Sequence, residues 1–212
     1  MKTTSHDQKQ TYLYRLLSSP QLYKISQKIF GRRKGYRILL NEYMLLKEGN
    51  SVLDIGCGTA DIVDFLPANI NYVGFDINSR YIAYAQAKYK DKDKVKLFCK
   101  RVSEADATLE KFDYIISMAV VHHLNDDEAI NLYRLGMELL KSEGVMIIID
   151  PTRNNSDSFI AKLLTNNDRG EHIRFPNEYE KLAKNVFPKV DVYIRNDMIN
   201  IDQSICVIVC KK

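Results

Sequence analysis

One ten-residue stretch constrains this chain more than any other. The sequence VLDIGCGTAD, at residues 52–61, is a short apolar run that reaches an acid and then a glycine-rich turn. This pattern predicts a buried parallel strand that leads through a tight loop into a helix starting near Asp61. Gly56 and Gly58 let the backbone turn sharply and approach a ligand without a Cβ atom in the way. We therefore expect a ligand cradle that faces the positive end of the following helix.

The residues around this loop distinguish between two kinds of nucleotide ligand. A dinucleotide fingerprint needs a third glycine at position 61, where Asp61 would oppose a pyrophosphate. Asp54, just before the glycines, suits a ligand that carries positive charge. A second predicted strand ends in Asp76, where a carboxylate can accept hydrogen bonds from both ribose hydroxyls. The two acids favour a cationic nucleoside, and the alternative is a glycine-rich turn that binds nothing.

Three motifs together resemble the class I S-adenosylmethionine-dependent methyltransferases. They are VLDIGCGTAD, YVGFDIN at residues 72–78 and FDYIISMAVVHHL at residues 112–124. The resemblance implies that the glycine loop passes under the methionine part of the cofactor, S-adenosyl-L-methionine, with Asp76 on the ribose and Ile77 against the adenine. The cofactor-binding residues expected on this basis are Asp54, Gly56, Cys57, Gly58, Asp76, Ile77, Arg101, Val102 and Met118.

One position departs from the pattern of that family. An acid after the third strand commonly bonds to the adenine amino group, but Arg101 stands at the corresponding place here and Val102 follows it. An arginine side chain cannot accept that hydrogen bond. We expect the backbone near Val102 or the nearby Glu104 to bind the adenine, unless the loop is displaced.

Strand and helix patterns alternate along the middle of the chain. They predict an α/β fold with a mostly parallel sheet and helices on both faces, and the resemblance implies a Rossmann-like sheet of seven strands with an antiparallel C-terminal strand pair. We expect one domain over residues 1–212, comprising an N-terminal helical cover (1–47), a cofactor-binding core (48–150), a substrate-side insertion (151–176) and a C-terminal helix with strands (177–212). Helices are predicted at 36–46, 79–89, 105–109, 127–141 and 177–185, after two short helices within 11–30, and strands at 95–99, 114–118, 145–149, 190–195 and 204–210. Asn177 and Glu180 have the spacing of a capping box.

The composition is that of an ordinary globular domain. Of 212 residues, 45% are hydrophobic and 27% are charged, which is compatible with one sizeable core. No run of about 18 apolar residues is present, and the polar start lacks the apolar region of a signal peptide, so we expect a cytoplasmic protein. The four cysteines do not have zinc-binding spacing, which predicts reduced thiols and no metal site.

The N-terminal part is more basic than the rest. Residues 1–48 contain ten lysines and arginines against three acids, whereas the whole chain has a net charge of only +4. This asymmetry suits a cover over an anionic substrate or a weak contact with a membrane surface. The alternative is a solvated face on helices that cover the sheet. No nucleic-acid partner is expected, because the basic cluster does not match a recognisable nucleic-acid-binding module.

Two regions of the chain are candidates for the acceptor side of the site. His122 and His123 follow the central strand, where parallel sheets place ligands, and either imidazole could serve as a general base or only pack beside the cofactor. In the insertion 151–176, a polar cluster could orient a hydroxylated or anionic acceptor or form a local structural pair. Its candidate substrate-binding residues are Arg153, Asp168, Arg169 and His172.

The predicted function is methyl transfer to a small-molecule acceptor, with oxygen slightly preferred because histidines lie at the expected site. A small amine as acceptor, a noncatalytic subunit that binds the cofactor, and a nicotinamide oxidoreductase are the alternatives. The chain lacks an Asn-Pro-Pro-Tyr or Asp-Pro-Pro-Tyr segment after the central strand, which argues against acceptors with planar nitrogen such as nucleobases.

Overall fold

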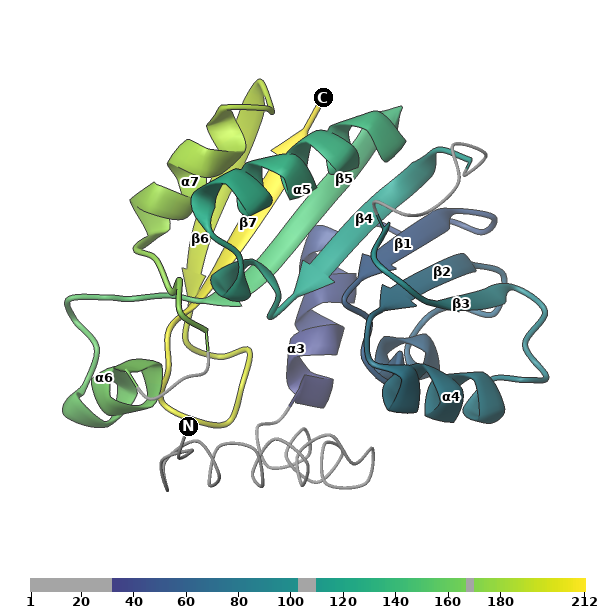
Figure 1. Ribbon diagram of the computed structural model, residues 1–212, viewed down its shortest axis with the longest axis horizontal. Helices are drawn as coiled ribbons and strands as arrows, with labels where there is room; N and C mark the ends of the chain where they lie inside the picture. The colour runs from purple at the N-terminus through teal and green to yellow at the C-terminus, as the bar shows by residue number, and fades with distance from the viewer. Residues whose placement is uncertain (1–31, 103–109, 167–169) are drawn as a thin grey trace, which may run out of the picture.

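A computed structural model describes residues 32–102, 110–166 and 170–212 of the chain. Its strands form one seven-stranded sheet in the order β3-β2-β1-β4-β5-β7-β6 (Figure 1). The strands are β1 (Ser51–Ile55), β2 (Asn71–Asp76), β3 (Val95–Cys99), β4 (Phe112–Met118), β5 (Leu140–Pro151), β6 (Lys189–Arg195) and β7 (Ile205–Lys211). The helices are α3 (Arg32–Ile38), η1 (Leu39–Tyr43), η2 (Asp61–Asp64), α4 (Ser79–Lys88), η4 (Val121–His123), α5 (Asp126–Leu139), α6 (Phe159–Asn166) and α7 (Pro176–Lys184).

The strand directions confirm the predicted Rossmann-like arrangement. Strands β3, β2, β1, β4 and β5 pair in parallel, whereas β7 lies antiparallel between β5 and β6. β3 and α4 were predicted almost to the residue, and β5 extends further at both ends than predicted. Because parallel strands need crossover connections, helices cover the sheet on both faces.

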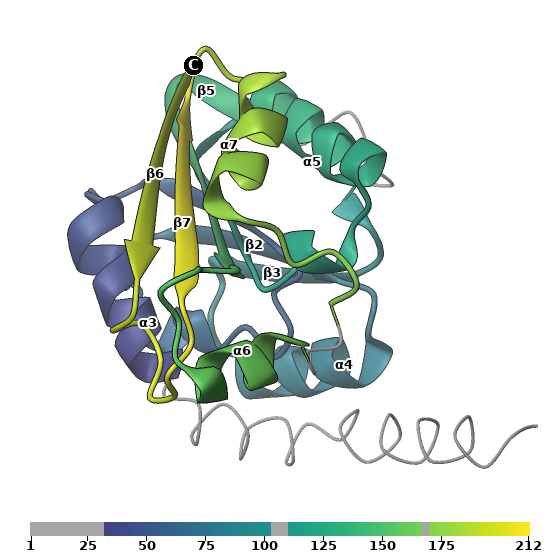
Figure 2. The same ribbon diagram turned by 90° about the vertical axis from the view of Figure 1, so that its left-hand side faces the viewer.

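Two hydrophobic cores lie on opposite faces of the sheet. One contains Tyr36 and Leu39 from the α3–η1 segment and Ile82 from α4, packed on the β1 side chain of Val52. The other contains Tyr133 of α5 and residues of α7. Figure 2 shows α5 and α7 on one side of the strands and α3 on the other. Residues 146–149 of β5 and 205–210 of β7 are continuous apolar runs, and they are buried on both faces of the sheet.

Three local predictions were wrong. The helix expected from Asp61 is only η2, a 3-10 turn of four residues, because Pro67 and the start of β2 follow within a few residues. The helix predicted at 36–46 begins at Arg32 and continues into the π-helical turn η1. The capping box expected at Asn177 and Glu180 does not begin α7, which starts at Pro176; instead the N–H of Phe175 donates to the Glu178 carboxylate, and the N–H of Glu178 donates to the Phe175 carbonyl.

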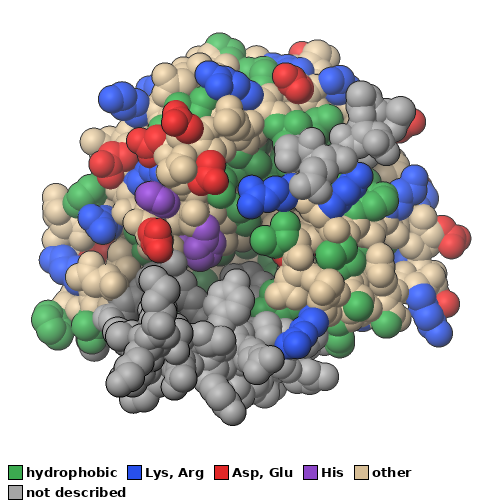
Figure 3. Space-filling view, viewed as in Figure 1, with side chains coloured by type: hydrophobic (Ala, Val, Ile, Leu, Met, Phe, Trp, Pro, Cys, Tyr) green, Lys and Arg blue, Asp and Glu red, His purple; other side chains and the backbone are tan. Residues whose placement is uncertain are grey.

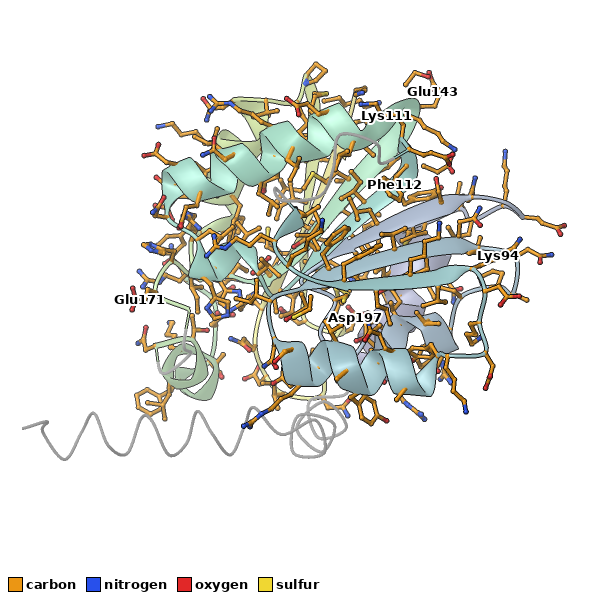
Figure 4. All side chains as sticks on the ribbon, turned by 45° about the vertical axis from the view of Figure 1, so that its right-hand side comes forward. Lys94, Lys111, Phe112, Glu143, Glu171 and Asp197 are labelled. Carbon is orange, nitrogen blue, oxygen red and sulfur yellow. The ribbon has the colours of Figure 1, made fainter. Side chains whose placement is uncertain are left out.

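The strand ends that build the site lie at one edge of the sheet. The register pairs Ile55 with both Phe75 and Ser117, and Met118 with Ile149. The loops after β1, β2, β4 and β5 therefore emerge side by side, as expected for a ligand site in an open parallel sheet. In Figure 4, Lys111 and Glu143 lie at the opposite end of the sheet from Glu171 of the insertion.

Several sequence predictions fall on residues that the structure does not describe. They are the two short helices within 11–30, the short helix at 105–109, Glu104, Asp168 and Arg169. None of the helices in the described ranges is long and apolar enough to cross a membrane. All four cysteines are free thiols. Among the described residues, no cluster of three or more histidines, cysteines and acids has a metal-binding arrangement. The division into four segments and the cytoplasmic location stay predictions.

Candidate active site

The glycine loop is held against the neighbouring strand by backbone hydrogen bonds. The carbonyl of Phe75 accepts from the N–H groups of Gly56 and Cys57, at 2.8 and 3.0 Å. Gly56 and Gly58 have φ angles of +78° and +55°, which side chains disfavour. A Cβ atom on Gly56 would also lie 2.4 Å from Val120 Cγ2. Both glycines are therefore required by the backbone, and the loop lies directly against the segment after β4.

Asp76 lies between this loop and the start of α4. Its Oδ2 accepts from the N–H of Gly58 at 2.9 Å, and its Oδ1 accepts from the N–H of Asn78 at 2.7 Å. A carboxylate has about four acceptor positions, so two bonds leave acceptor capacity for a diol. Burial raises the pKa of Asp76, although the two backbone N–H groups act in the opposite direction. The residue is thus fixed in place and half-buried at the position expected for a ribose contact.

An apolar shelf lies beside Asp76. The side chain of Ile77 is 69% exposed, and Phe98 of β3 is 37% exposed while its ring stacks on Phe75 at 5.0 Å. Large apolar side chains that remain exposed next to a carboxylate suit a flat, partly apolar ligand such as a purine nucleoside. The glycine cradle, the diol acceptor and this shelf together fit an adenosyl group.

Three of the expected cofactor-binding residues are buried or partly buried, namely Asp54, Cys57 and Met118. Asp54 is only 5% exposed, and its Oδ2 accepts from the Tyr72 hydroxyl at 2.7 Å. The Cys57 thiol packs where Gly74 of β2 has no side chain, and burial, followed by the nearby Asp54 and Asp76, raises its pKa. Met118 is partly buried against the same core. Their contact with a cofactor stays a prediction.

The Asp61 carboxylate, which the motif placed opposite a pyrophosphate, is bonded to two side chains of the protein. Its Oδ2 accepts from the Thr59 hydroxyl at 2.6 Å, and its Oδ1 accepts from Lys88 Nζ at 2.8 Å. Lys88, which lies 27 positions after Asp61, was not predicted from the sequence. Lys88 is half-buried at the end of α4 and lies outside the three motifs that indicated the cofactor site.

The loop after β3 contributes different groups from those of the family pattern. Arg101 is exposed, whereas Val102 is 6% exposed and packs in the core on the α5 side of the sheet. The adenine contact through the backbone near Val102 or through Glu104 stays a prediction, and Glu104 lies outside the described residues.

His122 and His123 differ sharply in their surroundings. The His122 side chain is buried, and its Nδ1 contacts Asp150 Oδ1 at the end of β5. The Asp150 carboxylate also accepts from the N–H groups of Val121 and His122, at 3.3 and 3.1 Å. His123 is exposed, and its ring centroid lies 4.0 Å from that of His122. His122 is oriented by a buried acid, and His123 is the more accessible of the pair.

Arg174 joins the insertion to the turn that carries the histidines. Its side chain is only 8% exposed, and its Nε and Nη2 both donate to Asp126 at the start of α5. Nη1 donates to the carbonyls of Val121 and His172, and Nη2 also donates to the carbonyl of Leu124. Arg174 was not predicted from the sequence, because three of its partners, Val121, Leu124 and Asp126, lie about fifty positions earlier.

The predicted substrate-binding residues are only partly brought together. The N–H of His172 donates to the His122 carbonyl at 2.9 Å, so His172 lies beside the histidine turn. Gly170 allows this approach, because a Cβ atom there would lie 2.0 Å from the His122 ring. Arg153 is exposed at the start of the insertion, and its N–H donates to the Arg174 carbonyl. Figure 3 shows histidine and acidic side chains gathered beside a hollow with partly hydrophobic walls.

The strand order, with β7 antiparallel between β5 and β6, is that of the class I methyltransferase architecture. Residues 52–144 match the family described as "Methyltransferase domain". This match over residues 52–144, together with the strand order, confirms the resemblance of the core to the class I S-adenosylmethionine-dependent methyltransferases.

Three similar proteins illustrate the range of that family. A ubiquinone biosynthesis O-methyltransferase of Rhodopseudomonas palustris is 33% identical over 109 residues, which are 50% of this chain and 42% of that protein. The chain thus spans less than half the length of that curated relative. A phosphoethanolamine N-methyltransferase 2 of Haemonchus contortus, solved with S-adenosylhomocysteine, has a TM-score of 0.72 at 16% identity and covers 95% of this chain and 59% of that one. A methyltransferase of Aquifex aeolicus has a TM-score of 0.63 at 15% identity, covering 92% and 94%. The two structures share the fold.

Proposed function

We propose that this chain transfers a methyl group from S-adenosylmethionine to a small-molecule acceptor, preferentially at oxygen. The observation that carries the proposal is the Asp76 carboxylate, fixed by the N–H groups of Gly58 and Asn78 beside the exposed Ile77. This combination offers a diol acceptor and an apolar shelf within a few residues. We propose that Gly56, Cys57 and Met118 contribute to the same cofactor site.

The chemistry asked of the protein itself is limited. When bound, S-adenosylmethionine supplies an electrophilic methyl group on a positively charged sulfur. Asp76 and the glycine loop would hold the nucleoside, and the turn after β4 would place the acceptor. Most of the rate gain would come from alignment and from exclusion of water. An oxygen acceptor must also lose its proton, which requires a base near the end of β4.

The histidine turn supports oxygen as the acceptor atom. His122 has its Nδ1 against the buried Asp150, an arrangement that orients an imidazole for proton transfer. His123 is exposed beside it and is the second candidate base. The curated relative described above is an O-methyltransferase, which favours the same atom. We propose that Arg153 and His172 contact the acceptor, since both lie on the segment that packs against this turn.

One observation favours nitrogen instead. The contacts of His122 with Asp150 and with Gly170 account for that residue as part of the scaffold, without a role in proton transfer. A neutral amine needs no base beyond solvent. Replacement of both His122 and His123 by alanine separates the two proposals, because an O-methyltransferase that uses either imidazole as its base loses turnover and an N-methyltransferase retains it.

Calorimetric titration with S-adenosylmethionine, S-adenosylhomocysteine and NAD tests the cofactor assignment. Binding of both sulfur nucleosides without binding of NAD is the expected result, and binding of NAD alone would contradict it. Radiolabelled methyl transfer to a panel of hydroxylated metabolites and amines then tests the acceptor. Activity on protein or RNA only would overturn the small-molecule proposal. Cofactor binding without transfer to any acceptor would favour a noncatalytic subunit.

A further inference from the structure

The glycine loop of this protein lacks the usual α-helical support on its C-terminal side. Only η2, one 3-10 turn, follows the loop. The residue between them, Ala60, is fully buried with φ +53° and ψ +31°, a left-handed conformation that alanine rarely adopts. A non-glycine residue keeps such a conformation only where surrounding contacts impose it. The loop therefore needs another anchor.

A chain of polar contacts supplies this anchor from α4. The Thr59 hydroxyl donates to Asp61, and Lys88 Nζ donates to Asp61 at 2.8 Å and to Asp64 at 2.7 Å. Lys88 Nζ also contacts the Tyr89 hydroxyl at 2.5 Å, and this hydroxyl donates to Asp64 at 3.1 Å. The side chains of Lys88 and Asp61 are 24% and 16% exposed, so the contacts are partly shielded from solvent. One ammonium group thus holds both acids of η2.

The other end of α4 holds the ribose-side carboxylate. Asn78 caps α4 by accepting from the N–H groups of Arg80 and Tyr81, and its own N–H donates to Asp76. Asp76 in turn accepts from Gly58 of the glycine loop. The loop is consequently tied to α4 at both ends of that helix, through Asp76 at the N-terminus and through Lys88 at the C-terminus.

We propose that Lys88 is a positioning residue for the cofactor site, which fixes the glycine loop through Asp61 and Thr59 without touching the ligand. This inference rests on the proposed function, because it names the device that preorganises the same site. Preorganisation lowers the ordering cost of binding, so its loss weakens affinity even when the contact residues are intact. Burial lowers the pKa of Lys88, but the hydrogen bonds to Asp61 and Asp64 outweigh this effect, and the lysine stays charged.

The test compares cofactor affinity among variants of the full chain. Titration with S-adenosylhomocysteine should give a dissociation constant about tenfold higher for Lys88→Met than for the unmodified protein, since charged hydrogen bonds that order the loop are lost. Lys88→Arg retains a cation and should restore the affinity to within about threefold. Lys90→Met, which changes an exposed lysine two residues further on, is the matched control and should bind normally.

A thermal unfolding scan without ligand separates positioning from stability, and all titrations are made at a temperature where every variant is folded. If Lys88→Met does not fold, Asp61→Asn serves as the second variant, and it should also weaken binding. Unchanged affinity in folded Lys88→Met, or an equal loss in Lys88→Arg, would overturn the role of Lys88 while leaving the proposed function intact. Failure of the unmodified protein to bind S-adenosylhomocysteine would overturn the proposed function, and the inference with it.

Discussion

The cofactor side and the acceptor side of the site are built in different ways. On the cofactor side, Asp76 bonds to Gly58, eighteen positions earlier, and to Asn78, two positions later. On the acceptor side, Arg174 bonds to Val121 and Asp126, which lie 53 and 48 positions away. The first half is therefore assembled within the continuous segment from the loop after β1 to the start of α4, and the second depends on contacts between distant segments.

This difference has consequences for the chemistry of each half. The cofactor side presents backbone N–H groups, glycines and one carboxylate, which suit a single invariant ligand. The acceptor side is a set of loops pinned by one buried guanidinium, and loops of this kind can change their outward-facing side chains while keeping their anchor. The comparison implies that substitutions on the acceptor side should act mainly through stability and acceptor selection, and substitutions on the cofactor side through affinity for the nucleoside.

The largest expected effect comes from Arg174→Met. It removes donors from the carbonyls of Val121, Leu124 and His172, and buried carbonyls left unpaired are costly. We expect the free energy of unfolding to fall by about 3 kcal/mol, measured by urea denaturation. The control is Arg153→Met, which replaces an exposed arginine on the same insertion. It should change the free energy of unfolding by less than about 0.5 kcal/mol. Equal effects of the two substitutions would contradict the anchoring role.

A somewhat smaller effect is expected from Gly56→Ala. The new Cβ atom combines a φ of +78° with an approach of 2.4 Å to Val120 Cγ2. Strain and overpacking together should cost about 2–3 kcal/mol and prevent normal cofactor binding. Gly49→Ala has a similar φ of +84° but no atom within 4 Å of the added Cβ, so it measures the strain alone. A stability loss in Gly49→Ala as large as in Gly56→Ala would show that contact with Val120 is unimportant.

The cofactor side could be predicted from the sequence more completely than the acceptor side. The glycine loop, Asp76 and strands such as β3 were predictable because each depends on a pattern within about ten residues. The reduction of the expected helix to η2 also had a local signal, namely Pro67 and the short distance to β2. The start of α7 likewise had one in Pro176, which suits the first helical position better than the Asn177 spacing that was chosen.

The residues that were not predicted, Arg174 and Lys88, have no comparable pattern in the neighbouring sequence. Arg174 and Lys88 look like ordinary surface cations in the sequence, and only the fold brings them to Asp126 and Asp61. The contrast between His122 and His123 was also hidden, since adjacent residues in a 3-10 turn point in different directions. Burial and long-range pairing therefore limit what the sequence alone predicts about the acceptor side.

Asp76→Ala should act on affinity. It removes a charged acceptor worth about 1.5–3 kcal/mol, so the dissociation constant for S-adenosylhomocysteine should rise by about tenfold or more. Since burial raises the pKa of Asp76, the carboxylate becomes protonated at a higher pH than an ordinary aspartate as the solution is acidified. Protonation removes acceptor capacity, and affinity should fall with decreasing pH in the unmodified protein but not in Asp76→Ala. Identical pH profiles for both would assign the effect to another group.

The smallest effect on stability is expected for His123→Ala. Its side chain is exposed, and the free energy of unfolding should change by less than about 0.5 kcal/mol. His122→Ala should instead cost about 1–2 kcal/mol, because it removes the ring contact of the buried Asp150. Once an acceptor is known, turnover can be compared at matched stability. If His123→Ala lowers kcat at constant cofactor affinity, the exposed histidine is the base. If only His122→Ala does, the buried dyad transfers the proton. If neither does, the turn only shapes the pocket and nitrogen becomes the favoured acceptor atom.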